Sequence, residues 1–334
     1  MLRASRAMIC ETVPGLGPGL GFRACIPRAD WHTLSPMIRV QVIVFVLLTG
    51  FATAQDGGEA GTGPAVDQRD YPDSINGCAP ATVLNLLRFG GAELARAEEA
   101  LVGATDGVKM RFLVDRYFRG RPSAVFPGQP RWGLHGIEAT DLAAGMRELF
   151  AEHHLAPCEA AYLDREEGED EGTHLHRVAS LIRDSIQAGL PPILNLRSFY
   201  VKRREENGSE PLWEAGVSHY VLVLALRTEP STCGVELAIL DPWRARRSVV
   251  YLHREANGRD FRALKGVAES GTWLSGRPFL QVLAPDLPTL RPADVEWSER
   301  YLVVANHLIG RFGLYSPVSP ESGGRSGREE TRKP

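Results

Sequence analysis

The sequence changes its hydrophobic pattern near its midpoint, and this change constrains the fold more than any other feature. Apolar residues first recur at helical spacing, which predicts helices. The expected helices cover residues 80–89, 92–101, 108–118, 138–153 and 174–188. Runs of β-branched and aromatic residues follow, and these predict strands. The expected strands cover residues 192–201, 218–226, 235–240, 248–253 and 278–284. Helices followed by strands indicate an α+β fold with a largely antiparallel sheet.

The composition is that of an ordinary globular protein. Of the 334 residues, 43% are hydrophobic and 24% are charged, and the formal net charge is −3. These values argue against disorder and against a protein with many membrane spans. A chain without a basic surface lacks what phosphate neutralisation requires, so we expect no nucleic-acid partner. Five cysteines are too few for a disulfide scaffold.

Residues 37–54 have the pattern of a secretory signal peptide. Arg39 supplies the positive charge, residues 40–50 are mostly apolar, and Ala52-Thr53-Ala54 forms a cleavage site of the A-x-A type. An apolar stretch of this length falls well short of the roughly 20 residues that cross a membrane. We therefore expect cleavage after Ala54 and an exported protein, periplasmic or extracellular, with no stable membrane insertion afterwards. Translation is expected to start at Met37, so residues 1–36 are expected to be an artefact of start-site choice.

The two ends of the remaining chain predict little structure. Residues 55–66 form a linker rich in glycine, alanine and acidic residues, and residues 316–334 form a tail of serine, glycine, proline and charged residues. Such segments have few apolar side chains to bury, so we expect the tail to be disordered. The folded domain is then expected to cover residues 67–315.

Three residues suggest nucleophilic catalysis. Cys78 lies where a helix is expected to begin, and a helix N-terminus stabilises a thiolate. His219 opens an apolar strand, where it could act as a general base, and Asp241 ends the next strand, where it could orient an imidazole. Each residue also has a structural interpretation: a buried cysteine, a core histidine and a strand-ending turn.

Other histidines do not suggest a metal site. His174 and His176 are two residues apart, and His153 and His154 are adjacent. Neither spacing is that of zinc ligands on a helix. We predict no metal and no cofactor.

The motifs, in order, are similar to those of a known family. They comprise Gln68 to Leu87 around Cys78, Gly189-Leu-Pro-Pro-Ile-Leu194, Ser218-His219-Tyr-Val-Leu-Val-Leu224 and Ile239-Leu-Asp241-Pro242. This order resembles the bacteriocin-processing, double-glycine-peptidase-like branch of the papain-like cysteine peptidases, in a stand-alone exported bacterial form.

The resemblance implies a fold and a set of roles. The fold would be papain-like, with a helical N-terminal part that carries the nucleophile at a helix start and packs on a mainly antiparallel sheet. Cys78 would be the nucleophile, His219 the base and later the acid, and Asp241 the orienting group. Gln68 would donate a hydrogen bond in the oxyanion hole.

The expected function is that of an exported cysteine peptidase that cleaves a peptide or amide bond in a peptide or protein substrate. One alternative is a catalytically silent papain-like module that binds a peptide or a cell-surface polymer. Another is a transglutaminase-like acyl transferase, which uses the same three residue types. Specificity depends on loops that the sequence does not place, so the substrate stays open.

Overall fold

A computed structural model describes residues 9–12, 23–26, 63–134, 136–203, 212–232, 234–253, 279–290 and 301–313. The chain divides into two compact units, Met1–Gly58 and Glu59–Pro334. In the first unit, β1 (Ile9–Thr12) and β2 (Arg23–Ile26) pair as an antiparallel two-stranded sheet. The predicted signal peptide (37–54), the predicted tail (316–334) and most of the predicted linker lie outside the described residues.

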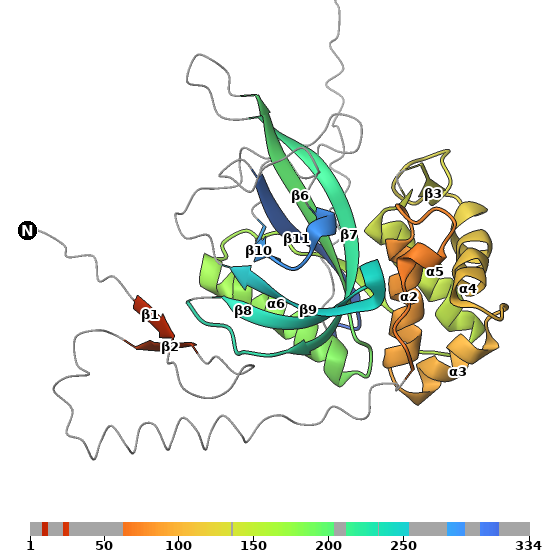
Figure 1. Cartoon of the computed structure of the whole chain (residues 1–334), viewed down its shortest axis with the longest axis horizontal. Helices are drawn as coiled ribbons and strands as arrows, with labels where there is room; N and C mark the ends of the chain where they lie inside the picture. The colour runs from red at the N-terminus through yellow and green to blue at the C-terminus, as the bar shows by residue number, and fades with distance from the viewer. Residues whose placement is uncertain are drawn as a thin grey trace, which may run out of the picture. The chain divides into compact units, whose positions relative to one another are not determined.

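The second unit begins with helices at the positions that the sequence predicts (Figure 1). They are α2 (Cys78–Phe89), α3 (Ala92–Ala100), α4 (Asp106–Leu113), α5 (Ala139–Glu152) and α6 (Glu171–Gln187). Helix α4 begins two residues earlier than expected because the Thr105 side chain caps it by accepting from the Val108 N–H. It continues as a π-helix over Val114–Arg119.

Seven strands of the second unit form one sheet. They are β5 (Glu159–Tyr162), β6 (Ile193–Arg203), β7 (Leu212–Leu226), β8 (Val235–Asp241), β9 (Arg246–His253), β10 (Gln281–Leu283) and β11 (Tyr301–Gly310). Their order is β10-β9-β8-β7-β6-β11-β5, and every pairing is antiparallel. Because β10 also pairs with β11, six of the strands close into a barrel. The predicted α+β fold with an antiparallel sheet is confirmed, and its papain-like identity stays a prediction.

A short hairpin lies between the helices. It consists of β3 (Trp132–Gly133) and β4 (Gly136–Ile137). The Trp132 ring stacks on the Phe118 ring and meets the Tyr71 ring edge to face. These contacts fix the hairpin against the helices.

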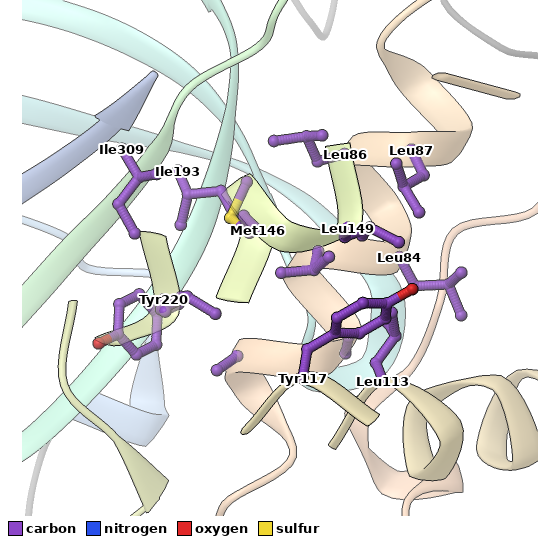
Figure 2. Close-up of a cluster of buried hydrophobic side chains, with 14 of the residues drawn as sticks. Leu84, Leu86, Leu87, Leu113, Tyr117, Met146, Leu149, Ile193, Tyr220 and Ile309 are labelled. Carbon is purple, nitrogen blue, oxygen red and sulfur yellow. The ribbon is translucent and has the colours of Figure 1, made fainter. Parts of the chain in front are cut away.

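Two hydrophobic cores lie on opposite faces of the sheet. Residues alternate between the faces of a strand, so Ile193 of β6 joins the first core and Leu194 joins the second. The first core holds side chains of α2 to α5 and includes Leu84, Leu149 and Tyr220, which Figure 2 labels. The second lies among the barrel strands and α6. Burial of the first core packs α2 against the sheet.

The folded domain starts earlier than residue 67. Val66 is fully buried, and its N–H donates to Asn85 Oδ1 (2.7 Å) while Asn85 Nδ2 donates to its carbonyl (3.1 Å). Arg88 Nη1 also donates to the Pro64 carbonyl (2.6 Å). The end of the predicted linker is therefore held along α2, because two buried or half-buried α2 side chains bind its backbone.

Within the described residues, no helix is both long enough and apolar enough to span a bilayer.

Candidate active site

Cys78 is the first residue of α2, as the sequence predicts. Gly77 precedes it, and a Cβ atom at position 77 would lie 2.7 Å from the Gln68 carbonyl oxygen, so only glycine fits there. Pro80 falls in the first turn, where a missing N–H costs no helical hydrogen bond. Cys78 thus lies at the end of the helix whose first N–H groups have no acceptor within the helix.

Helix α2 is bound directly to the strand that carries His219. The Thr82 hydroxyl donates to the carbonyl of Tyr220, the residue after His219 (3.1 Å), and Thr82 is fully buried. Thr82 follows Cys78 by one helical turn, so both lie on the same face of α2. This hydrogen bond holds the nucleophile helix against β7 at the position of the histidine.

His219 contacts both of the other predicted catalytic residues. Its Nε2 donates to Asp241 Oδ1 (2.7 Å), and Cys78 lies close enough to contribute to the raised pKa of His219. Because Asp241 occupies Nε2, Nδ1 is the ring nitrogen left for the sulfur. His219 and Asp241 are buried, at 2% and 1% exposure, whereas Cys78 is 7% exposed. The structure thus brings together Cys78, His219 and Asp241, of which His219 and Asp241 are hydrogen-bonded to each other.

The environment of His219 favours its charged form. Burial lowers the pKa of His219, but the hydrogen bond to Asp241 and the proximity of Cys78 outweigh this effect and raise the pKa to about 9. An imidazole with this pKa is protonated at neutral pH. A protonated imidazole beside a thiol is the pairing that nucleophilic catalysis by a cysteine uses.

Asp241 is itself held in place by the turn that follows it. Its Oδ1 accepts from the backbone N–H of Trp243 (2.9 Å), two residues on. Asp241 ends β8, and the side chain of an aspartate at such a position often accepts from the residue two further along. One carboxylate oxygen thereby binds both the turn and the imidazole.

Gln68 lies beside the nucleophile. It is buried (3% exposed), and its carbonyl packs against Gly77. Its Nε2 donates to the Ser74 carbonyl (2.7 Å), which uses one of the two N–H bonds of the amide. Its Oε1 is buried without a hydrogen-bond partner, and the predicted oxyanion role of Gln68 stays a prediction.

Tyr220 ties the hairpin to the site. Its hydroxyl donates to the Ile137 carbonyl (2.8 Å). Burial raises the pKa of Tyr220 well above its usual value, and the charges of Glu138 and Cys78 add to this effect. The hydroxyl therefore stays protonated and continues to donate at any pH that the protein meets.

Two exposed apolar side chains lie in the loop before Cys78 and in the hairpin turn joined to it. Ile75, three residues before the nucleophile, is 85% exposed, and Leu134, in the hairpin turn, is 91% exposed. Asn76 Nδ2 donates to the Leu134 carbonyl (3.2 Å), which joins the two loops. We call Ile75 and Leu134 the apolar rim. Both residues belong to loops that hydrogen bonds fix beside the site.

The other predicted features lie elsewhere. Cys158 is a buried free cysteine, and burial raises its pKa to about 12. Cys233 lies outside the described residues. His153 and His154 line a surface hollow with Glu93 and Arg96. Within the described residues, no three His, Cys, Asp or Glu side chains are grouped in a way that could hold a metal ion.

Some supporting residues of the site were not predicted. Thr82 could have been found, because it follows Cys78 by one turn of an amphipathic helix. The Asp241–Trp243 contact also has a sequence signal, since Asp-Pro commonly opens a turn. The apolar rim has none, because the exposure of Ile75 and Leu134 depends on how two loops meet in the fold.

Comparisons with protein-family models, with curated proteins and with solved structures found no match to this chain. The function proposed below therefore follows from the geometry of Cys78, His219 and Asp241.

Proposed function

We propose that this protein is a cysteine peptidase of the papain-like type that attacks a peptide or amide carbonyl through Cys78. The observation that carries the proposal is that Cys78, at a helix start, lies beside His219, which is hydrogen-bonded to Asp241. A helical part with the nucleophile, followed by strands with the base and the orienting carboxylate, has the chain order of the family that the sequence resembles.

The proposed reaction has two stages. The Cys78 thiolate forms a bond to the carbonyl carbon, and the carbonyl oxygen becomes an oxyanion that the Cys78 N–H and the second Gln68 N–H bind. The C–N bond then breaks, and the leaving amine takes the proton of the His219 imidazolium. Neutral His219 next removes a proton from water, whose oxygen attacks the thioester and releases the acid and the thiolate.

The apolar rim supports a peptide as the substrate. Large apolar side chains exposed to water at fixed positions mark binding surfaces. Ile75 and Leu134 suit contact with the side chains of a peptide better than with a polar cell-surface polymer. This observation favours the peptidase over a module that binds such a polymer.

We also propose that the protein acts outside the cytoplasm, on the basis of residues 37–54. N-terminal sequencing of the exported protein tests this proposal: the chain should begin at Gln55.

Digestion of a proteome-derived peptide library tests the activity. The wild-type protein and Cys158→Ala should cleave the same peptide bonds, and Cys78→Ala should leave the library intact, with products read by mass spectrometry. Peptide binding without cleavage by the wild type would favour the silent module. Peptides that instead acquire an added primary amine would favour the acyl transferase.

A further inference from the structure

Two short segments that flank the site are joined to each other. One is the 3₁₀ turn Gln68–Asp70, which packs on Gly77, and the other is the 3₁₀ turn Trp243–Ala245, which follows Asp241. The Gln68 N–H donates to the Pro242 carbonyl (2.8 Å), and the Arg244 N–H donates to Asp67 Oδ1 (3.2 Å). We call this pair of hydrogen bonds the clasp.

The turn that follows Asp241 has an unfavourable backbone conformation. Arg244 has φ 64° and ψ 19°, and Ala245 has φ 50°. Such left-handed conformations are costly for residues other than glycine and persist only where surrounding contacts impose them. Among the described residues, only His154 shares this property outside glycine. A contact must therefore hold the turn after Asp241 in place.

Asp67 supplies that contact. Its Oδ1 accepts from the Arg244 N–H, and the same carboxylate accepts from the Arg69 N–H (3.0 Å) and from the Arg69 guanidinium. The Arg69 backbone N–H holds Oδ1 in place, and a substitution of the Arg69 side chain leaves this N–H unchanged. Asp67 follows Val66, and Asn85 of α2 binds the Val66 backbone. The clasp is therefore connected to the helix that begins at Cys78.

The geometry of the turn determines where Asp241 points. The Trp243 N–H binds Asp241 Oδ1, the same oxygen that accepts from His219. A change in Arg244, the next residue, would move the Trp243 peptide and rotate this carboxylate away from the imidazole. Loss of the Asp67 acceptor would therefore shift Arg244, then the Trp243 peptide, and so weaken the hydrogen bond between Asp241 and His219.

We propose that Asp67 is a positioning residue for the site: it holds Arg244 in its left-handed conformation and so keeps Asp241 directed at His219. This inference rests on the proposed function, because it concerns how the Cys78–His219 pair is maintained. The acceptor oxygen matters here, and the negative charge of Asp67 does not.

The test measures the rate at which iodoacetamide labels Cys78 at pH 6 in the full-length protein. Asp67→Ala should slow labelling by about 10- to 100-fold, since misplacing a catalytic group by about 1 Å can cost this much. Asp67→Asn keeps the Oδ1 acceptor and should label within about 3-fold of wild type. Arg69→Gln is the matched control, because it removes the ion pair and leaves Oδ1 in place. It should label like wild type.

A second substitution separates positioning from general damage. Glycine adopts a left-handed conformation without penalty, so Arg244→Gly in the Asp67→Ala background should restore most of the labelling rate. In the presence of Asp67, Arg244→Val should slow labelling, because a β-branched residue resists that conformation. Thermal unfolding of each variant checks that it is folded, and the Arg244 variants decide the matter if Asp67→Ala is not.

The outcomes distinguish this inference from the proposed function. One outcome would overturn the clasp alone: the wild type labels fast, His219→Ala labels slowly, and Asp67→Ala labels as fast as the wild type. An Asp67→Ala/Arg244→Gly variant no faster than Asp67→Ala would also overturn it. Slow labelling of the wild type, indifferent to His219→Ala, would overturn the proposed function and the clasp together.

Discussion

At the scale of single residues, the proposed function gives His219 two tasks that depend on its charge. As proposed, it stabilises the Cys78 thiolate and later protonates the leaving amine, and both tasks need the imidazolium. Its Asp241 and Cys78 partners raise its pKa to about 9 against the effect of burial. The imidazolium is therefore the main form below about pH 9 and is lost above it.

We expect the first half of the reaction to slow as the pH rises through about 9. Above that value the imidazole is neutral and has no proton for the amine, so acylation by an amide should fall while acylation by an activated ester, whose leaving group needs no proton, should persist. Stopped-flow measurement of thioester formation over pH 6–10 checks this. An amide and an ester that respond alike across this range would exclude His219 as the proton donor.

Gln68 should contribute only where an oxyanion forms. A peptide aldehyde adds to the Cys78 sulfur and places a negatively charged oxygen in the oxyanion hole, whereas iodoacetamide forms no such oxygen. Gln68→Ala should therefore weaken aldehyde binding by about 10- to 100-fold, of the order expected for one donor, and change iodoacetamide labelling little. Equal aldehyde affinities in the two proteins would remove Gln68 from the oxyanion hole.

At the scale of elements, the hairpin and the loop before α2 are fixed beside the site by hydrogen bonds of Tyr220 and Asn76. The strands and helices that hold Cys78, His219 and Asp241 are buried, whereas the apolar rim is exposed. Selectivity should thus depend on the loops, and reactivity on the elements beneath them.

The apolar rim should select apolar peptide reagents. A leucine-containing peptidyl chloromethyl ketone should label Cys78 faster than an aspartate-containing one, and Ile75→Ser with Leu134→Ser should reduce this preference by about 10-fold. The iodoacetamide rate should not change. Leu283→Ser is the matched control, since Leu283 is 48% exposed on β10, which pairs with β9 away from the Asp241 end. A preference that survives the double substitution would place the selectivity elsewhere.

Helix α6 carries a second histidine with a shifted pKa. His174 is 3% exposed, its Nε2 donates to the Leu163 carbonyl (2.9 Å), and burial lowers its pKa to about 4. The unfolded chain binds a proton near pH 6.5, and the folded protein does so only near pH 4. Stability is therefore present above pH 6.5 and is lost as the pH falls from 6.5 toward 4.

This linkage should amount to about 3 kcal/mol of unfolding free energy by pH 4. His174→Gln should remove most of this loss, because glutamine can donate the same hydrogen bond without taking up a proton. His176→Gln, an exposed neighbour on the same helix, should leave it unchanged. Urea unfolding at pH 7 and pH 4 measures the difference, and equal acid sensitivity in the wild type and His174→Gln would refute this origin.

At the scale of the whole molecule, the periodic elements could be predicted and the closure of the sheet could not. The five helices and five of the strands follow from local patterns, because each buries one continuous apolar face. The prediction does not include β5 and β11. β11 has an apolar run of strand type, Leu302 to Ala305, whereas its pairing with β5, β6 and β10 joins distant segments that local patterns do not connect.

The candidate site shows the same division. Cys78, His219 and Asp241 were predicted because each lies at the end of an element with a clear apolar pattern. The clasp was not, because Asp67 and Arg244 are 177 residues apart and meet through a backbone N–H that any residue type could supply. Contacts of this kind leave no signal in residue identity.

In the proposed function His219 activates Cys78, and the pH dependence of Cys78 alkylation tests this activation most directly. An ordinary cysteine, with a pKa of about 8.5, is less than about 1% thiolate at pH 6 and labels slowly. If His219 activates Cys78, iodoacetamide should label Cys78 at pH 6 at least about 10-fold faster than an ordinary cysteine, and before it labels Cys158. His219→Ala should abolish the advantage, and Asp241→Asn should reduce it less. Labelling of Cys78 that matches an ordinary cysteine at every pH, with or without His219, would contradict the account.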